Sequence, residues 1–553
     1  MTLMGLLFSS RKKTFAAVAV LSVLSAVLSV AVLAFISQRL LAGGADLPVV
    51  LLQFVLLLVA LFVTATLAQV TLHVLGHRMV YGLRRDLVRR VLATDIEQLE
   101  KVGGPHLLAA LSTDLRNLTI AFVHLPELVY GAALSVAALG WLAWLAPGLF
   151  VVTVVWLLAT AVMGVWLVGR INFHIGKVRE GDDHLYQDYQ AMIDGRKELA
   201  LNRPRAARFF DEEFDGHARA YRDHVTRADI YNGLAGNMAN VLVLALIGVL
   251  FYLAVGQGWA DANTASIFAL TILLLRTPLI GAVAALPTLL SARVSLRKLA
   301  GLQLAADSAD LLQSTSNTLS GFSTLSLQGV CYHYPEQDGA PGFAVGPLDI
   351  TIRRGELIFV QGGNGSGKST FARLLTGLYR PQQGELIVDG EPVTESTRVA
   401  FRQLFSSVFT DFHLFSRLLK GDGTDVASAD VDAWLATLGM QHKVREQDGR
   451  LSDIRFSQGQ RKRLALLMAV VESRDCLLLD EWAADQDPQF RQFFYLDLLP
   501  RLQATGKTII AITHDDHYFD RADRLLKMDA GRLQEIDDLS ARESVQVLRE
   551  ASL

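Results

Sequence analysis

The sequence predicts an α-helical membrane domain of six spans followed by an α/β domain, on the strength of three observations. Hydrophobic residues make up 51% of the chain and its mean hydropathy is +0.32, which is too apolar for an ordinary soluble protein. The apolar excess lies in the first three hundred residues, in runs long enough to cross a bilayer. The remainder contains short buried strands, one of which leads through a glycine-rich loop into a helical pattern.

Six apolar runs form the expected spans, since about 30 Å of hydrocarbon needs roughly twenty helical residues. They cover Phe15 to Ile36, Val49 to His73, Pro126 to Leu145, Leu149 to Val168, Leu234 to Val255 and Ala265 to Leu290. The first run follows Arg11, Lys12 and Lys13, as a signal peptide would. It is too long for one and has no small-residue cleavage site, so we expect it to stay in the mature protein.

Loop charges predict the orientation of these spans, because short loops rich in Lys and Arg stay in the cytoplasm. The loops after spans two and four carry many basic residues, among them Arg84, Arg85, Arg170 and Lys177. The three opposite loops together carry only Arg39. We therefore expect both termini and the α/β domain on the cytoplasmic side.

Net charge and cysteine content exclude other classes of protein. The net charge of −3 and the pI near 6.5 give no indication of a nucleic-acid partner. Cys331 and Cys476 are the only cysteines and have no metal-type spacing. Both are interpreted as structural thiols in a reducing compartment.

The glycine-rich loop fits the phosphate-binding pattern G-x-x-x-x-G-K-[ST] and lies between a strand, Leu357 to Val360, and a helix. Backbone N–H groups of such a loop close around phosphate oxygens at a helix N-terminus, the lysine reaches the terminal phosphates, and the serine hydroxyl binds Mg²⁺. We expect ATP to bind here, at Gly362, Gly363, Asn364, Gly365, Ser366, Gly367, Lys368, Ser369 and Thr370.

Four further residues complete a nucleotide-hydrolysing site. Asp480 and Glu481 end an apolar strand, where Asp480 is expected to hold Mg²⁺ through water and Glu481 to orient or deprotonate the attacking water. His514 ends another buried strand, from which an imidazole can contact the γ-phosphate, although a lone His is usually structural. Tyr334 is placed to stack on adenine, although a tyrosine at a strand edge often merely packs.

Phe456-Ser457-Gln458-Gly459-Gln460-Arg461 resembles the Leu-Ser-Gly-Gly-Gln signature loop of ATP-binding-cassette (ABC) proteins. Six spans followed by one cassette is the layout of an ABC exporter half-transporter, so the resemblance covers essentially the whole chain. It implies the type IV exporter fold, with a transmembrane domain over residues 1–304, a linker over 305–321 and a cassette with a C-terminal helical tail over 322–553. In that family Ser457, Gln458, Gly459 and Gln460 close on ATP held by the partner chain, which implies a homodimer with two composite sites.

Several residues differ from the usual family pattern and indicate one branch of the family. Thr410 occupies the place of a Gln that helps to bind Mg²⁺ in such cassettes, and Asp411 is the alternative ligand, acting through water. The segment Trp482 to Pro488 replaces the more usual Ala-Thr-Ser-Ala-Leu-Asp. These features resemble the cyclic-peptide exporter branch, which includes the exporters of a lasso-peptide microcin and of a pyoverdine precursor.

This resemblance implies ATP-driven export of a peptide or peptide-like siderophore across the bacterial inner membrane. The expected partners are a second copy of the chain, the cargo and membrane lipids, with room for periplasmic or outer-membrane export components and no nucleic acid. A lipid flippase or multidrug exporter is the main alternative. An ATP-gated channel or regulator ranks lower because Glu481 and His514 are both present, and a soluble ATPase anchored by one span does not need six.

The sequence predicts the cargo-binding residues less clearly than it predicts the ATP site. Polar residues in or beside the spans that can line a water-filled cavity are Gln69, His73, His124, Glu127, Asn237, Asn240 and Arg276. Arg276 is the most suggestive, since a charge within the membrane costs several kcal/mol unless it faces protein or water. A structural pair between Arg276 and a carboxylate such as Glu127 is the competing interpretation.

The two long cytoplasmic loops are expected to continue the membrane helices and to carry force. In ABC exporters, short helices in these loops contact the cassettes. By position we assign them to Asp95 to Val102 and to Asp188 to Gly195, expect them to dock beside Thr410 and Phe412, and choose Tyr189 as the anchor of the second.

Overall fold

The computed structural model describes residues 12–40, 47–305, 321–335 and 342–536, apart from the side chains of a few residues inside the helices. It divides into two compact units, of which the first comprises Met1–Leu87 and Pro105–Gln303 and the second comprises Val88–Gly104 and Leu304–Leu553. The second unit therefore contains a short piece of the helical region, Val88–Gly104, in addition to the α/β domain. The linker and the C-terminal tail expected from the sequence lie largely outside the described residues.

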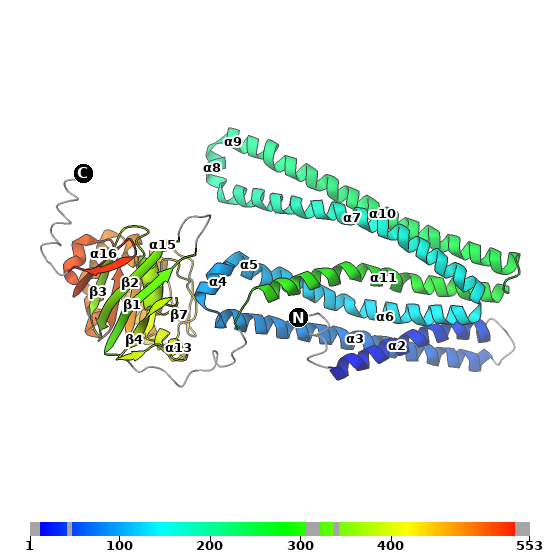
Figure 1. Ribbon diagram of the computed structural model, residues 1–553, viewed down its shortest axis with the longest axis horizontal. Helices are drawn as coiled ribbons and strands as arrows, with labels where there is room; N and C mark the ends of the chain where they lie inside the picture. The colour runs from blue at the N-terminus through cyan, green and yellow to red at the C-terminus, as the bar shows by residue number, and fades with distance from the viewer. Residues whose placement is uncertain (1–11, 41–46, 306–320, 336–341, 537–553) are drawn as a thin grey trace. The chain divides into compact units, whose positions relative to one another are not determined.

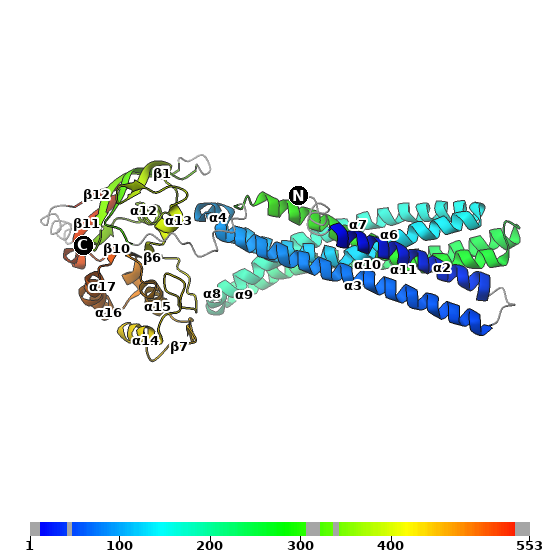
Figure 2. The same cartoon turned by 90° about the horizontal axis from the view of Figure 1, so that it is seen from below.

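Long helices make up the first unit, and Figures 1 and 2 show them running side by side. They are α2 (Lys12–Phe35), α3 (Leu47–Ala93), α6 (Leu115–Leu145), α7 (Pro147–Asp194), α10 (Asp215–Phe251) and α11 (Ala262–Gly301). The short helices are α5 (Gly104–Ala109), α8 (Arg196–Leu201) and α9 (Arg203–Arg208), with π-helical turns η1 (Ile36–Leu40), η2 (Ala110–Asp114), η3 (Phe209–Phe214) and η4 (Tyr252–Gly256).

Within the described residues, five stretches of helix are long and apolar enough to cross a membrane. They are Ala16–Arg39, Leu47–Ala93, Gly104–Leu145, Pro147–Asp194 and Arg203–Gly256. They contain the first five expected spans, so those predictions are confirmed as far as length and composition decide. The sixth expected span lies within α11, where several side chains between positions 279 and 290 fall outside the described residues, and it stays a prediction.

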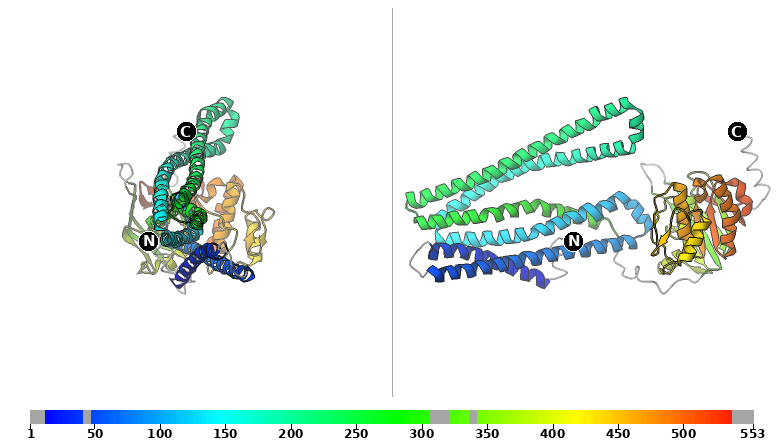
Figure 3. Two further views of the ribbon diagram at one scale, coloured as in Figure 1. Left: turned by 90° about the vertical axis from the view of Figure 1, so that its right-hand side faces the viewer. Right: turned by 180° about the vertical axis from the view of Figure 1, so that it is seen from behind.

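Helices α7 and α10 form an antiparallel hairpin whose tip is α8 and α9, and this tip diverges from α6 and α11 in Figure 3. The prediction of a separate short helix over Asp188 to Gly195 is wrong. Helix α7 runs unbroken to Asp194, because residues 188–194 contain no glycine or proline to interrupt it. The separate short helix is α8, which begins directly after the predicted segment, at Arg196.

The other short helix, α4 (Ile96–Val102), belongs to the second unit, with Asp95 at its N-cap position. The prediction of a short helix over Asp95 to Val102 is therefore confirmed. Its ion pairs and hydrogen bonds go to Arg373, Tyr379 and the segment around Arg398. Docking beside Thr410 and Phe412 stays a prediction.

The α/β domain of the second unit contains a four-stranded sheet in the order β2-β1-β4-β5 and a six-stranded sheet in the order β12-β11-β3-β10-β9-β6. The strands are β1 (Thr324–His333), β2 (Ala344–Arg353), β3 (Leu357–Gln361), β4 (Gln383–Val388), β5 (Glu391–Pro392), β6 (Phe405–Val408), β9 (Cys476–Asp480), β10 (Thr508–Ile512), β11 (Arg524–Asp529) and β12 (Arg532–Glu535). Strands β7 (Glu446–Gln447) and β8 (Arg450–Leu451) form a separate hairpin.

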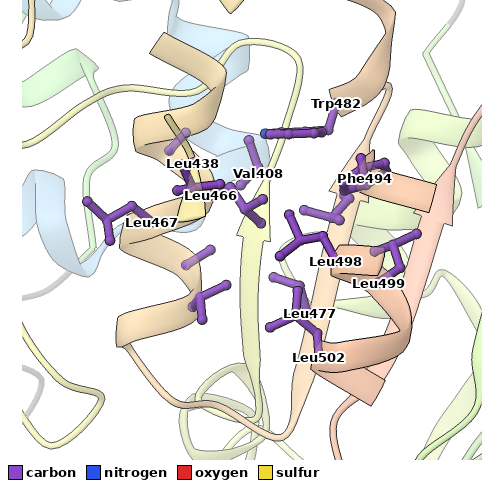
Figure 4. Close-up of a cluster of buried hydrophobic side chains, with 14 of the residues drawn as sticks. Val408, Leu438, Leu466, Leu467, Leu477, Trp482, Phe494, Leu498, Leu499 and Leu502 are labelled. Atoms are coloured by element: carbon purple, nitrogen blue, oxygen red, sulfur yellow. The ribbon is translucent and has the colours of Figure 1, made fainter. Parts of the chain in front are cut away.

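The helices of this domain are α12 (Lys368–Leu375), α13 (Arg398–Arg402), α14 (Ser428–Thr437), α15 (Gln458–Val471), α16 (Pro488–Phe493) and α17 (Leu499–Ala504), with the short turns η6 (Trp482–Asp485), η7 (Phe494–Leu498) and η8 (Asp516–Arg521). Strands β3, β9 and β10 are buried on both faces, as their continuous apolar runs predict. One core cluster packs α15 and α17 against β6 and β9, with Trp482 among its largest side chains (Figure 4).

Candidate nucleotide site

Parallel pairing brings four functional loops to one edge of the six-stranded sheet. Strands β3, β10, β9 and β6 are neighbours and run parallel. Their carboxyl ends therefore meet at the same edge, where ligands of α/β sheets bind. The glycine-rich loop follows β3, His514 follows β10, Asp480 and Glu481 end β9, and Thr410 follows β6.

The glycine-rich loop has the backbone conformation that the pattern predicts. Gly365 and Gly367 have φ of +76° and +107°, a region that residues with a Cβ rarely adopt. A Cβ at Gly362 would lie 2.3 Å from the carbonyl oxygen of Met528, so this position has no room for a side chain. Helix α12 begins at Lys368, which directs its N-terminal N–H groups and positive dipole toward the loop.

Lys368 is buried and lies across its own loop. Its Nζ donates hydrogen bonds to the carbonyl oxygens of Gly362 at 2.9 Å and Gly363 at 3.0 Å. The same Nζ lies 3.8 Å from Oε1 of Glu481. The ammonium group therefore stands between the phosphate-binding loop and the acidic end of β9.

Asp480 and Ser369 present oxygen atoms suited to a hard cation. Ser369 Oγ donates to Asp480 Oδ2 at 3.4 Å, while Asp480 Oδ1 is buried and has no hydrogen-bond partner within the described residues. Burial, followed by the charge of neighbouring Glu481, raises the pKa of Asp480 to about 6. A divalent cation would compensate this buried carboxylate, so the residues present fit Mg²⁺.

Glu481 and His514 contact each other, with His514 Nε2 and Glu481 Oε1 3.1 Å apart. The Glu481 backbone has φ of +49°, which is rare for a residue with a side chain. The carboxylate lies next to both the lysine of the glycine-rich loop and the imidazole. This arrangement can orient a water molecule and stabilise developing charge, as phosphoryl transfer requires.

The tyrosine proposed to stack on adenine lies beside the helix of the glycine-rich loop. The hydroxyls of Tyr334 and Thr370 are hydrogen bonded at 2.9 Å, and the Tyr334 ring meets that of Tyr332 edge to face with centroids 5.1 Å apart. Tyr334 is half-buried, so part of its ring remains accessible. Tyr334 therefore packs against its neighbours, and its stacking on adenine stays a prediction.

Thr410 and Asp411 are exposed in the turn after β6. The negative charge of Asp411 acts on Arg373 of α12. Burial lowers the pKa of Arg373, but nearby acidic groups outweigh this effect and raise it; these groups are Tyr379, Glu100, Tyr334 and Asp411. The structure thus places both expected metal ligands at the correct edge of the sheet, without a hydrogen bond to Ser369 or Asp480 among the described residues.

The signature residues lie at the start of α15. Ser457 is the N-cap residue, Ser457 and Gln458 are exposed, and Gly459 and Gln460 are half-buried. A Cβ at Gly459 would lie 2.5 Å from the carbonyl oxygen of Asp485, so close packing requires glycine there. Within the part of the chain that the structure describes, no hydrogen bond joins residues 457–460 to residues 362–370.

Sequence reasoning missed several residues that support this site. Lys462 of α15 donates to the carbonyl oxygen of Glu481 at 2.6 Å, and Trp482 Nε1 donates to the carbonyl oxygen of Lys462 at 2.6 Å. The only sequence feature that could have indicated these contacts was the unusual Trp at position 482, because a Lys five residues after Ser457 is otherwise predicted to be an exposed helix residue.

Cys476 needs no functional role, since it is buried in β9 and burial raises the pKa of its thiol.

Of the polar residues proposed to line a cargo cavity, Arg276 has a clear contact. Its guanidinium donates a hydrogen bond to Asn240 Oδ1, which joins α11 to α10. Gln69 and Asn237 are exposed, whereas His73 and His124 are half-buried. The competing partner of Arg276, the Glu127 side chain, lies outside the described residues.

Comparison with known proteins agrees with this arrangement. Residues 345–484 match the ABC transporter family. The ATP-binding protein SyrD of Pseudomonas syringae pv. syringae is 36% identical over 472 residues, which cover 82% of each chain. The ATP-dependent lipid A-core flippase of Burkholderia orbicola is 24% identical over 84% of this chain and 79% of its own length.

A solved structure shows the same fold. The structure of a bacterial Atm1-family ABC exporter with ATP bound superimposes with a TM-score of 0.71 at 19% sequence identity. The match covers 97% of this chain and 99% of that chain. The chain therefore has the fold of that exporter, with a helical domain and an α/β domain.

Proposed function

Because the chain belongs to the ABC transporter family, we propose that it exports a peptide or peptide-like siderophore across the bacterial inner membrane as a homodimer. The general activity follows from the family and the fold: the chain is a membrane-embedded exporter that binds ATP and couples its hydrolysis to transport. The cargo, the dimer, Mg²⁺ and the residue roles are the proposed part.

The observation that carries the proposal is the convergence of Lys368, Ser369, Asp480, Glu481 and His514 at one edge of the sheet. In this proposal Lys368 binds the terminal phosphates, Ser369 and Asp480 hold Mg²⁺, Glu481 orients the attacking water, and His514 contacts the γ-phosphate. Mg²⁺, when bound, neutralises phosphate charge. Thr410 and Asp411 contribute to its outer coordination, and Tyr334 stacks on adenine.

Replacing Glu481 by Gln and Lys368 by Ala separates these roles. Glu481→Gln should keep ATP affinity and lower turnover by about 100-fold or more, because only the orientation of water is lost. Lys368→Ala should lose ATP affinity itself, measured by binding of a fluorescent nucleotide to the full-length protein. Near wild-type turnover by Glu481→Gln would refute its role and make Asp411 the next candidate.

The exposed signature residues support a composite site shared by two chains. Ser457 and Gln458 are exposed at the start of α15, where a second chain can bring its ATP. Lys368→Ala chains mixed with Ser457→Arg chains should form heterodimers with one doubly damaged site and one intact site, and some hydrolysis should return. A mixture as inactive as both parents would contradict the sufficiency of one intact site, and an active purified monomer would contradict the dimer.

The peptide-like cargo is supported by the sequence departures at Thr410 and over Trp482 to Pro488, which resemble cyclic-peptide exporters. Lipid is the second candidate, since a relative that covers 84% of this chain is named a lipid A-core flippase. Stimulation of ATP hydrolysis in nanodiscs by a peptide panel and by lipids distinguishes the two. Stimulation by lipids alone would overturn the peptide proposal.

Orientation and location belong to the same proposal. The basic loops after spans two and four favour a cytoplasmic ATPase with both termini inside. Labelling of single cysteines with a membrane-impermeant reagent checks this in spheroplasts. A cysteine in place of Asp261, which precedes α11, should be labelled from outside, whereas one in place of Leu201 should not.

A further inference from the structure

The backbone of Glu481 adopts a conformation that its own residue type does not favour. Its φ and ψ are 49° and 38°, in the left-handed region, where a residue with a Cβ is strained by about 1 kcal/mol or more. Its N–H donates to the carbonyl oxygen of Ile512 at 3.0 Å, which ties one side of the residue to β10. The other side needs a partner of its own, since the direction of the side chain depends on both peptide units.

Lys462 supplies that partner from α15, next to the Ala484 N–H, which donates to the same Glu481 carbonyl oxygen over a longer 3.4 Å. Its Nζ donates to the carbonyl oxygen of Glu481 at 2.6 Å and pairs with Asp485 Oδ2 at 2.7 Å. The Lys462 side chain is only 5% exposed, so this ammonium group is buried at the end of β9. Removal of a single partner from a buried charge is costly, which makes the position of Lys462 dependent on Asp485.

Two neighbouring contacts fix the same junction. Trp482, which is buried, donates from Nε1 to the carbonyl oxygen of Lys462 at 2.6 Å and extends into the core cluster (Figure 4). Gln486 Nε2 donates to the carbonyl oxygen of Gly459 at 3.0 Å. The segment after Glu481 and the start of α15 are thus held together at three points, and only the Lys462 contact reaches Glu481 itself.

The position of the Glu481 carboxylate depends on this junction. It lies 3.1 Å from His514 Nε2 and 3.8 Å from Lys368 Nζ, between the two groups that would face the terminal phosphate. Rotation of the peptide after Glu481 toward ordinary φ and ψ would move the carboxylate away from both. A misplacement of about 1 Å is enough to lower a catalysed rate by roughly 100-fold.

We propose that Lys462 is a positioning residue for ATP hydrolysis, which orients the Glu481 carboxylate through the Glu481 carbonyl oxygen and is itself held by Asp485. Lys462 touches neither the nucleotide nor the water. The inference rests on the proposed role of Glu481 as the residue that orients water. It does not depend on the cargo or on the dimer interface.

Basal ATP hydrolysis and ATP binding by the full-length protein in nanodiscs test this inference. Lys462→Met should lower kcat by about 10- to 100-fold and change the dissociation constant of a fluorescent ATP analogue by less than about threefold. Asp485→Asn should show the same split. The conservative variants Lys462→Arg and Asp485→Glu should recover part of the rate, because both keep the charge pair.

Lys507 provides a matched control. Its Nζ also donates to a backbone carbonyl oxygen, that of Arg474 at 2.7 Å, but at the opposite end of the sheet, before β10. Lys507→Met should keep kcat within about threefold once the folded fraction is measured by thermal unfolding. An equal loss of kcat in Lys507→Met and Lys462→Met would show a general effect of removing a buried lysine and would overturn the proposal.

Combination with Glu481→Gln gives the decisive measurement. If Lys462 acts through Glu481, adding Lys462→Met to a Glu481→Gln chain should lower the residual turnover by less than about twofold. A further loss of tenfold or more would overturn the proposal, and so would a Lys462→Met chain with normal kcat. If Glu481→Gln itself keeps normal turnover, the proposed role of Glu481 fails first, and the two failures are distinguishable. Should Lys462→Met not fold, Asp485→Asn carries the same comparison.

Discussion

The two short helical tips, α4 and the pair α8 and α9, connect the same kind of long helices but differ in charge and in anchoring. Helix α4 is acidic and is fixed within the second unit by ion pairs. The sequence from Arg196 to Arg208 is basic, and its Leu201 side chain is 90% exposed. The first tip is therefore stabilised by contacts inside its own unit, whereas the second presents apolar surface.

Asp95 is the main anchor of α4. Its carboxylate lies 3.1 Å from guanidinium nitrogens of both Arg380 and Arg398, and 3.2 Å from Arg402. Burial opposes the charge of Asp95, but the three arginines outweigh it and lower its pKa. Because three cations share this one carboxylate, the packing of α4 against α13 depends strongly on Asp95.

Glu100 provides a second anchor one turn later. It accepts a hydrogen bond from the Tyr379 hydroxyl and lies 3.5 Å from Arg373 of α12, the helix that starts at the glycine-rich loop. Burial and the contact with Glu100 raise the pKa of Tyr379. Through these contacts α4 is connected to the nucleotide site within one compact unit.

The second tip encloses a cleft instead. A cleft of about 800 Å³ lies between α8, α9 and the end of α7, and Glu198, Arg205 and Phe209 are among its lining residues. Within the tip, Arg196 donates to the carbonyl oxygen of Ile193 at 2.8 Å, and Asn202 caps α9. The tip holds its own shape by local hydrogen bonds, so mutations in the two tips should have unequal effects on stability.

The largest effect is expected from Asp95→Asn, because it leaves three clustered guanidinium groups without their shared carboxylate. We expect a loss of about 1–3 kcal/mol in the docking of α4. Hydrogen exchange of amides 96–103 in nanodiscs measures it and should accelerate about tenfold or more. Glu395→Gln is the matched control: Glu395 pairs with Arg380 and Arg398 but lies outside α4 and is mostly exposed. Equal acceleration in both variants would contradict the anchoring role of Asp95.

A smaller effect is expected from Glu100→Gln, since glutamine can still accept the Tyr379 hydroxyl while it loses the ion pair with Arg373. The expected cost is about 1 kcal/mol, and Tyr379→Phe should cost a similar amount. The double variant tests coupling: its exchange rate over amides 96–103 should increase by less than the product of the single effects. Strict multiplicativity would show that Glu100 and Tyr379 act separately.

Tyr189 is expected to matter less, and for stability rather than for coupling. It lies in α7, is 46% exposed and packs on Phe214 of η3 with ring centroids 5.9 Å apart. Tyr189→Ala should cost about 0.5–1.5 kcal/mol, read from thermal unfolding. Tyr186→Ala, in the same helix but more exposed, is the control and should be neutral. The anchor role assigned to Tyr189 from the sequence stays a prediction, and loss of transport by Tyr189→Ala with unchanged unfolding would support it.

The smallest stability effect is expected from Leu201→Ser, because a side chain exposed to this extent loses almost no burial. The change should stay within about 0.5 kcal/mol. Export in proteoliposomes should nevertheless fall if this apolar residue docks on a partner surface, whereas basal ATP hydrolysis should remain. A marked drop in the unfolding temperature would show that Leu201 is packed, and unchanged export would remove the second tip from coupling.

Most residues of the nucleotide site could be predicted from sequence patterns. The glycine-rich loop, Asp480, Glu481 and His514 each stand at the end of a predicted strand, and parallel pairing necessarily brings such ends together. The location of the second short helix was wrong by about two turns, since it was assigned by position in the loop and not from a residue that ends the long helix. Lys462 was missed because burial of a lysine depends on partners far away in sequence, here Glu481 and Asp485.

Local chemistry was therefore determined by the amino-acid sequence itself: apolar runs long enough for a membrane, a loop that only glycine can form, and carboxylates at the end of a buried strand. These features depend on residues close together in the chain, and hydrophobicity and backbone sterics act at that range. The tertiary structure alone decided the left-handed backbone of Glu481, the burial of Lys462 and the anchoring of α4 by Asp95. Each depends on groups between 19 and 307 positions apart, whose charges interact strongly only when folding removes water from between them.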